Sequence, residues 1–266
     1  MRRTERGSRS HGEAGRAWDV FLPLALLVLL LGLWEGLVRG MNVPPYLLPP
    51  PSRIFAAFFT RFGFLWPHIL ATLGEILLGL AMGAAGGFAL GSAMFYWPTF
   101  DRAVRPFVIA SQMVPVFAIA PLLIVWMGYG LWPKAIVAAL ISFFPVAVNS
   151  LDGLRAANPE TVDLLYSFGA TEWQTFRKLR MPAGLPQILS GLKIGATLAV
   201  VGATIGEWIG GQRGLGYLML QANAQLRMET VFASILALTI IGLLVFGGFR
   251  IIERRLLRWQ HPDDLA

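Results

Sequence analysis

The chain has 266 residues, of which 56% are hydrophobic and only 14% are charged, and its mean hydropathy is +0.62. An average soluble domain carries roughly 25% charged residues, so this composition excludes an ordinary soluble enzyme and a disordered chain. Cysteine is absent, which excludes disulfides, thiolate catalysis and cysteine-ligated metal sites. The formal net charge of +7 fits either nucleic-acid binding or the basic cytoplasmic loops of a membrane protein.

Six segments are long and apolar enough to cross a bilayer as helices. About 20 residues rising 1.5 Å each are needed for a hydrocarbon layer about 30 Å thick. The segments are 20–38, 65–95, 105–134, 134–152, 185–209 and 229–250. The sequence therefore predicts an all-α polytopic membrane protein with six transmembrane helices. The first segment could instead be a cleaved signal peptide, but no small-residue cleavage site follows it.

The positions of the basic residues predict the orientation. With the N-terminus inside, 16 of the 22 Lys and Arg residues face the cytoplasm and 6 face outward, so both termini are expected to be cytoplasmic. This topology explains the basic charge without nucleic acid, and we expect no nucleic-acid partner. The first 16 residues, rich in arginine, are expected to form a disordered tail attracted to anionic membrane lipid.

These expectations divide the chain into successive parts. Residues 1–18 form a cytoplasmic tail, and 19–38 form the first transmembrane helix. An extracytoplasmic loop at 39–64 contains a short helix that begins at Ser52. Residues 65–255 form a transmembrane domain of five helices, including a cytoplasmic loop at 152–182, and 256–266 form a second cytoplasmic tail.

Small residues recur at helical spacing in the second and fifth segments. Four-residue spacing places such residues on one face, where they let a neighbouring helix approach closely. They are Gly79, Gly83, Gly87 and Gly91 in the second segment, and Gly191, Gly195, Ala199, Gly202 and Gly206 in the fifth. We interpret these faces as packing seams, and a seam that slides during gating is the alternative.

Polar and helix-breaking residues inside the apolar segments are candidates for a solute path. Glu75 and Glu207 are costly in lipid and are expected to face the bundle interior or water, either as structural partners or in the path. Pro115 and Pro121 should break the third segment, and irregular backbone at membrane depth is tolerated where it lines an aqueous cavity. The candidate path residues are Glu75, Gln112, Met113, Phe117 and Glu207. His68 is expected to be an interfacial anchor, and no metal site is expected.

The longest predicted cytoplasmic loop contains two short helices. Asn158 is an N-cap residue followed by Pro159 at the first helical position, and the helix should stop at Gly169. Thr171 and Gln174 form a capping box that opens a second helix, expected to end before Pro182. This second helix exposes aromatic side chains beside a basic edge, which favours a docking surface over a solvated loop.

The loop resembles a known sequence motif. Its stretch DLLYSFGATEWQTFRKLRMP is similar to the EAA loop of binding-protein-dependent ABC importer permeases, EAA-x3-G-x9-I-x-L-P. Residues 163–165 stand in place of Glu-Ala-Ala and keep only its acidic character, at Asp163. Gly169 matches the glycine of the motif, Leu179 its isoleucine, and Met181 with Pro182 its Leu-Pro. The resemblance covers about residues 20–258, within the branch that handles nitrate, sulfonates, taurine and thiamine-precursor pyrimidines.

The resemblance implies a type I ABC importer permease fold and a set of partners. These are a second permease copy, two ATP-binding subunits that the loop contacts, and an extracytoplasmic solute-binding protein. The residues implied to dock onto the ATPase are Asp163, Gly169, Ala170, Thr171, Trp173, Phe176, Leu179 and Pro182. The GEWIGG stretch around Glu207 is closer to the pyrimidine or riboflavin type than to the sulfonate type.

The chain lacks an ATP-binding motif of its own. A P-loop needs Gly-Lys followed by Ser or Thr, and none of the three lysines follows a glycine. The sequence thus predicts no enzyme and no bound cofactor, with ATP and magnesium held by the partner ATPase. An ion-coupled secondary transporter would use Glu75 and Glu207 as proton carriers, but it leaves the cytoplasmic loop unexplained. An intramembrane hydrolase would need a nucleophile and base within the spans, and Ser190 lacks the surrounding motif.

Overall fold

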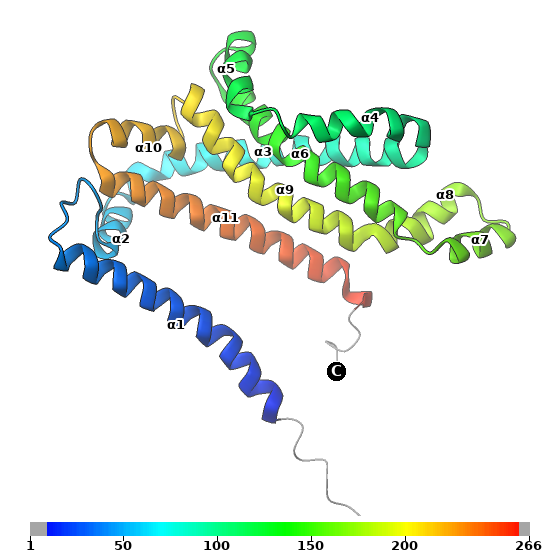
Figure 1. The fold of residues 1–266 in the computed structure, drawn as a ribbon, viewed down its shortest axis with the longest axis horizontal. Coiled ribbons are helices and arrows are strands. Elements are labelled where there is room, and N and C mark those ends of the chain that lie inside the picture. The colour runs from blue at the N-terminus through cyan, green and yellow to red at the C-terminus, as the bar shows by residue number, and fades with distance from the viewer. Residues whose placement is uncertain (1–9, 261–266) are drawn as a thin grey trace, which may run out of the picture.

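The computed structural model describes residues 10–260, so the predicted tail segments 1–9 and 261–266 lie outside it. Within the described range the chain is helical and contains no β-strand (Figure 1). Its α-helices are α1 (Ser10–Gly40), α2 (Pro51–Thr60), α3 (Phe62–Tyr96), α4 (Pro98–Ser111), α5 (Val116–Met127), α6 (Leu131–Arg155), α7 (Pro159–Ser167), α8 (Glu172–Thr175), α9 (Met181–Gly210), α10 (Leu215–Ala224) and α11 (Met228–Leu256). A π-helical turn, Phe176–Arg180, joins α8 to α9, and a 3-10 turn, Arg258–Gln260, follows α11.

Helix α1 already begins at Ser10, so residues 10–16, which were expected to be disordered, are helical. The apolar residues that start at position 20 are continuous with a preceding stretch of good helix formers, Glu13, Ala14 and Arg16, and no terminator separates the two. The predicted helix after the first span is confirmed as α2, which begins at Pro51.

Among the described residues, five helices are long and apolar enough to cross a membrane: α1, through its part Phe21–Gly40, α3, α6, the continuous helix Glu172–Gly210, and α11. The pair α4 and α5 makes a sixth only as a broken span, bent by 95°. The third predicted segment, 105–134, is therefore not one straight helix. Pro115 has no amide hydrogen and disfavours helical geometry at Val114, so the chain breaks before α5 begins. Pro121, by contrast, lies within α5 without ending it.

The helices α3, α6 and α9 form the centre of the bundle, and glycine allows their close packing (Figure 1). A Cβ atom added at Gly79 would lie 2.7 Å from the carbonyl oxygen of Ala135 on α6. A Cβ atom at Gly202 on α9 would lie 2.6 Å from the Cα of Ala138, on the same helix α6. All nine small residues of the two predicted faces are buried. The interlocked backbones favour fixed packing seams over sliding ones.

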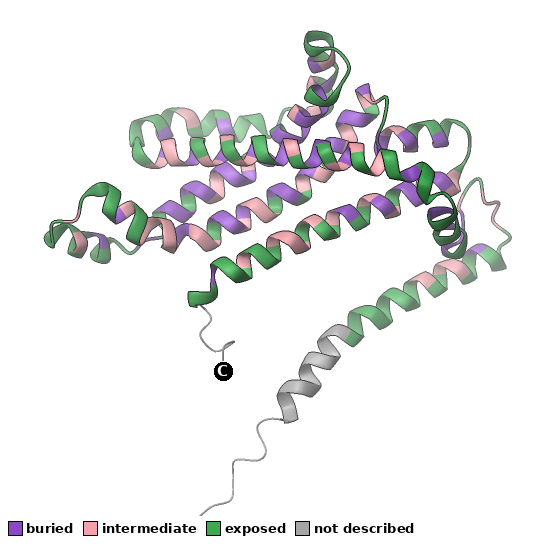
Figure 2. Cartoon of the chain, turned by 180° about the vertical axis from the view of Figure 1, so that it is seen from behind, coloured by how far each residue is buried: buried purple, intermediate pink, exposed green. Residues whose placement is uncertain are grey.

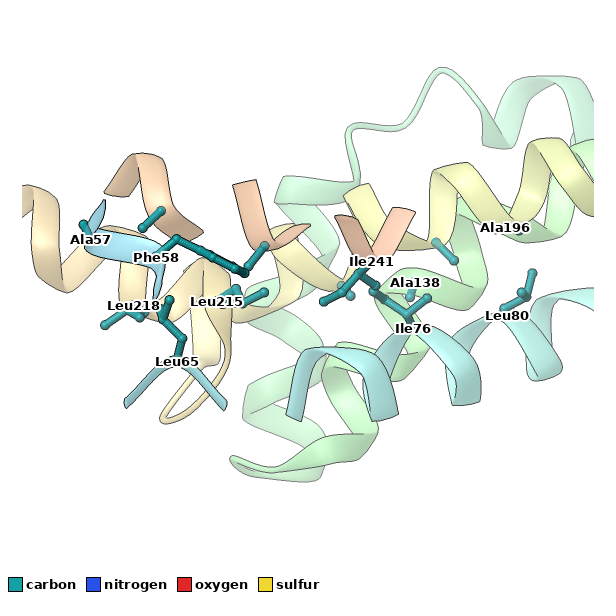
Figure 3. Packing of buried hydrophobic residues seen from close by; sticks show 14 residues of the cluster. Ala57, Phe58, Leu65, Ile76, Leu80, Ala138, Ala196, Leu215, Leu218 and Ile241 are labelled. Atoms are coloured by element: carbon teal, nitrogen blue, oxygen red, sulfur yellow. The ribbon is translucent and has the colours of Figure 1, made fainter. Parts of the chain in front are cut away.

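A second part of the core closes one end of this bundle. Figure 3 shows Phe58 of α2, Leu65 of α3 and Leu215 and Leu218 of α10 packed together, and Ile241 of α11 continues the cluster toward α3. The short helices α2 and α10 thus cover one end of the bundle, called here the α10 end. The helices α7 and α8 project from the opposite end, the α7–α8 end (Figure 1).

Helix α1 stands apart from the centre of the bundle, and most of its residues between 21 and 40 are exposed (Figure 2). In the most apolar 18-residue stretch of α1, only 6% of the residues are buried within the chain. The helix contacts α2, where the Oε1 and Oε2 of Glu35 accept hydrogen bonds from the hydroxyl and amide of Ser52 at 2.7 and 3.0 Å. It also contacts α11, where the ring of Phe232 lies 5.7 Å from that of Trp34. Exposed leucine and phenylalanine side chains along α1 suit a lipid environment.

Candidate functional site

The loop between α6 and α9 folds as two short helices joined by a glycine elbow, as predicted. The Oδ1 of Asn158 accepts a hydrogen bond from the amide of Glu160 at 2.9 Å, which caps α7. Gly169 has φ +79°, the left-handed conformation in which glycine commonly ends a helix at low cost. The amide of Thr171 donates to the Oε1 of Gln174 at 2.9 Å, and the amide of Gln174 donates to the Thr171 hydroxyl at 3.3 Å. This confirms the capping box.

Aromatic side chains dominate the exposed surface of this loop. Trp173 is 65% exposed and Phe168 is 80% exposed. The ring of Trp173 stacks on that of Phe176 at 5.6 Å, and Phe176 in turn contacts Tyr96 at the end of α3. The loop therefore presents a large apolar surface on a base that the transmembrane helices hold in place.

The second loop helix does not end before Pro182, and that prediction is wrong. The chain passes from α8 through the π-helical turn Phe176–Arg180 directly into α9, and one helix runs over Glu172–Gly210. A π-helical turn shifts the backbone hydrogen-bond register, so Pro182, at the start of α9, is accommodated without a break. At 1.5 Å per residue this helix is about 58 Å long, and it connects the exposed loop to the α10 end.

The structure distributes the predicted docking residues over the loop and the following helix. Asp163, Gly169, Thr171 and Trp173 are exposed. Four others are half-buried: Ala170, Phe176, Leu179 and Pro182. The predicted set is thus one continuous segment, exposed on α7 and α8 and increasingly covered toward α9.

The structure contains an ion-pair cluster near the α7–α8 end that the sequence analysis did not predict. The carboxylate of Asp101 on α4 pairs with Arg105 on the same helix at 2.8 Å and with Arg155 at the end of α6 at 2.9 Å. The four-residue spacing of Asp101 and Arg105 was a visible signal for the first pair. The second pair joins two residues that are 54 positions apart in the sequence, and it fixes α4 beside the start of the loop.

The candidate path residues fall into two groups. Glu75 and Glu207 are both 1% exposed and lie inside the bundle near the α10 end. Gln112, Met113 and Phe117 lie on the surface at the break between α4 and α5. The structure therefore does not bring the five residues into one site within a single chain.

Each buried carboxylate has a structural partner. The ammonium group of Lys134, in the first turn of α6, donates to the Oε1 of Glu75 on α3. The Oε2 of Glu207, near the end of α9, accepts a hydrogen bond from the amide of Gly216 at 2.5 Å. This contact places a negative charge at the N-terminus of α10, where free amides and the helix dipole stabilise it.

Two further side chains of α3 secure the start of α10, and the sequence interpretation missed both contacts. The hydroxyl of Thr72 donates to the Oε1 of Glu207 at 2.5 Å and accepts from the amide of Leu215 at 2.8 Å. The Nδ1 of His68 lies 3.0 and 3.1 Å from the backbone oxygen and nitrogen of Gly214. His68, which was expected to be an anchor at the membrane interface, therefore contacts the turn before α10 at Gly214. No group of three potential metal-ligating side chains occurs in the described part of the chain.

These features define a polytopic helical membrane protein with one broken span and an exposed loop continuous with a central helix. Over residues 75–258 the chain matches the family described as the binding-protein-dependent transport system inner membrane component, and it belongs to this family. It is 39% identical over 253 residues to the formylaminopyrimidine transport permease protein ThiX of Halalkalibacterium halodurans, covering 92% of this chain and 98% of that protein.

Other relatives carry different solutes in their names. The chain is 34% identical over 241 residues to the riboflavin transport system permease protein RibX of Chloroflexus aurantiacus, covering 90% of each protein. It is 31% identical over 249 residues to the taurine transport system permease protein TauC of Escherichia coli, covering 91% of this chain and 90% of TauC.

A solved structure supports the fold. A chain of the inward-facing MetNI methionine ABC transporter superposes with a TM-score of 0.63 at 19% identity, covering 73% of this chain and 98% of that one. The protein is therefore a multi-pass inner-membrane permease subunit of an ABC importer with a type I fold, and as a permease it is a non-catalytic subunit. The family implies an ATPase, a solute-binding protein and a second permease subunit as partners.

Proposed function

We propose that two copies of this chain form the solute path of an importer that is driven by two separate ATP-binding subunits, which hold ATP and magnesium. Both termini face the cytoplasm, and the α10 end faces the solute-binding protein outside. The 16-to-6 distribution of basic residues supports this orientation. With it, α7 and α8 project into the cytoplasm.

The loop made of α7 and α8 is the docking element for the ATPase. The single observation that carries this proposal is the exposed Trp173 on a capped helix that continues, without a break, into α9. Asp163, Gly169 and Thr171 shape or flank the contact surface. Exposed aromatic side chains on a rigid base are typical of the residues that dominate protein interfaces.

The continuous helix suits a mechanism of alternating access. ATP binding brings the two ATPase subunits together, and the docked loops move with them. Because α8 and α9 form one helix and α9 is interlocked with α6, this motion reaches the α10 end as movement of a rigid unit. Solute enters when the path opens outward, and ATP hydrolysis returns the path to its inward-facing state.

The path itself is proposed to include the surface residues at the α4–α5 break, Gln112, Met113 and Phe117. Met113 is 78% exposed and Phe117 is 49% exposed. A break of this kind is tolerated at membrane depth where it faces protein or water. Facing a second copy across the path satisfies this requirement. Glu75 and Glu207 border the same path from within the bundle.

The transported solute is a small polar compound, and a thiamine-precursor pyrimidine or a riboflavin-like compound is favoured over a sulfonate. The support is the higher identity to ThiX and RibX, 39% and 34%, than to TauC at 31%. An ion-coupled secondary transporter is disfavoured, since Glu75 pairs with Lys134 and Glu207 caps α10.

A substitution of Trp173 by alanine tests the docking proposal. The purified transporter should lose most of its ATPase subunit, and uptake into proteoliposomes should fall at least tenfold, because a large exposed aromatic side chain is removed from the docking surface. Trp66→Ala is a matched control for ATPase association, because Trp66 is 47% exposed and also contacts a nearby phenylalanine, Phe62, but it lies on α3 near the α10 end. Full uptake and normal ATPase association in Trp173→Ala would show that this loop does not couple the subunits.

A further inference from the structure

The end of α11 and the turn that follows it carry a group of exposed arginines, called here the α11 arginine cluster: Arg250, Arg254, Arg255 and Arg258. None of them forms an ion pair with a described residue. The one acidic residue among them, Glu253, accepts two hydrogen bonds from the ammonium group of Lys193 on α9, at 2.7 and 2.8 Å. The C-terminus of a helix supplies only about half a negative charge, so the cluster keeps a large positive charge.

The length of α11 places this cluster at the edge of the bilayer. Residues 230–249 contain no charged side chain. At 1.5 Å per residue they span about 30 Å, which is the thickness of the hydrocarbon layer. Arg250 therefore lies where the hydrocarbon ends, and the following residues lie among the lipid headgroups on the side of the α7–α8 end.

Exposed apolar side chains lie between the arginines. They are Ile251, Ile252, Leu256 and Trp259, which are 57%, 46%, 47% and 55% exposed. Long basic side chains beside aliphatic ones, with a tryptophan at the end, suit the boundary between headgroups and acyl chains. An acidic protein surface would match the arginines but would leave the adjacent isoleucine side chains without an apolar partner.

The described part of the chain leaves this surface uncovered. Helix α1 contacts α11 near the α10 end, where Trp34 lies against Phe232. From there the two helices diverge toward the other end of the molecule (Figure 1). The end of α11 is accordingly exposed (Figure 2).

We propose that the α11 arginine cluster is a binding site for anionic phospholipid. The lipid phosphate accepts hydrogen bonds from the guanidinium groups, a pairing that suits the geometry of arginine, and the acyl chains pack on Ile251 and Ile252. The bound phosphate neutralises the cluster, so the arginines no longer repel one another or compete with Lys193 for Glu253. The lipid thereby holds the end of α11 against α9. This site is additional to the proposed function and does not depend on the solute.

The test uses the permease with its ATPase in phosphatidylcholine vesicles that contain a photoreactive phosphatidylglycerol, and it measures labelling of residues 250–260. Labelling should fall about fivefold or more in Arg254→Gln/Arg255→Gln, because each arginine near the membrane surface attracts anionic lipid. Arg254→Lys/Arg255→Lys keeps the charge and should retain most of the labelling. Arg213→Gln/Arg227→Gln is the matched control, because it removes two exposed, unpaired arginines near the α10 end, and it should leave labelling unchanged.

A second measurement reports on the contact between α9 and α11. Addition of phosphatidylglycerol to the phosphatidylcholine vesicles should raise the thermal unfolding midpoint of the wild type and of the control. It should raise the midpoint of Arg254→Gln/Arg255→Gln much less. An equal rise in all three proteins would show that the lipid does not act through this cluster.

The remaining outcomes identify other occupants. Equal labelling by a photoreactive phosphatidylcholine, or unchanged labelling in the glutamine variant, would overturn the anionic lipid site. A several-fold increase after removal of the ATPase would assign the cluster to that subunit. The same increase after deletion of residues 261–266 would assign it to Asp263 and Asp264 of the chain itself. Either increase would overturn the proposal.

Discussion

The carboxylate of Glu207 accepts a hydrogen bond from the amide of Gly216, nine residues later in the chain, at 2.5 Å. This contact folds the segment after α9 back onto the helix and fixes the N-terminus of α10. Gly214, between them, has φ +123°, and a Cβ atom there would overlap the Glu207 carboxylate. The turn is therefore built around this side chain, and Glu207 is a structural residue whatever else it contacts.

Glu207→Gln should loosen α10 specifically. Glutamine keeps the shape of the side chain but loses the charge that strengthens hydrogen bonds to backbone amides, at a cost of about 1.5–3 kcal/mol. Hydrogen exchange of the amides of residues 214–218 should accelerate at least tenfold, whereas exchange in α6 stays unchanged. Glu229→Gln is the control, because Glu229 forms only a partly exposed pair with Arg53 at 3.6 Å. Equal acceleration in both variants would argue against the capping role.

The ion pair between Lys134 and Glu75 should show strong coupling between its two residues. Glu75→Gln alone leaves the ammonium group of Lys134 buried without its countercharge, a change that typically costs about 3–5 kcal/mol. Adding Lys134→Met removes that charge and should restore much of the lost stability. Thermal unfolding in detergent measures both effects. If the double variant were as unstable as the sum of the two single variants, the pair would not be coupled.

Helix α3 should reject a methyl group at a glycine of its seam with α6 and tolerate one at a glycine beside the seam. A Cβ atom at Gly83 would overlap the Ser142 hydroxyl and lie 2.8 Å from the carbonyl oxygen of Ala139. Gly83→Ala should therefore destabilise the protein by about 1–3 kcal/mol. At Gly86, one turn away, the nearest atoms are ring carbons of Phe143 at 3.4 Å.

Gly86→Ala should be neutral or stabilising by up to about 1 kcal/mol, since alanine favours the helix. The difference between the two unfolding midpoints is the measurement. Equal midpoints would mean that α3 and α6 move apart easily, as a sliding seam requires.

The sequence predicted those features of the fold that local chemistry determines. The capping box of Thr171 and the elbow at Gly169 each depend on residues a few positions apart, and both were correct. The apolar segments were also located well, because their length follows from the bilayer alone. The end predicted before Pro182 was wrong because a π-helical turn, which has no simple sequence signal, carries the helix past the proline.

The contacts that define the α10 end could not be predicted in the same way. Thr72 and Glu207 are 135 residues apart, and Lys134 and Glu75 are 59 apart. The cost of a charge in lipid indicated only that each carboxylate needs a partner. The choice of that partner depends on how α3, α6 and α9 align, which their glycine faces permit but do not specify.

Gly169 allows the conformation of the elbow to be tested apart from steric contact. No atom lies within 4 Å of a Cβ atom added there, so a small side chain meets no obstacle within the chain. Its φ of +79° nevertheless disfavours alanine by about 1–2 kcal/mol, whereas asparagine tolerates this region better. Uptake should therefore decrease in the order wild type, Gly169→Asn, Gly169→Ala, although asparagine is the larger side chain. Gly247→Ala, also without a neighbour within 4 Å but inside α11, is the control and should keep full uptake. If alanine transported better than asparagine, side-chain size at the docking surface, and not the backbone conformation of the elbow, would govern coupling.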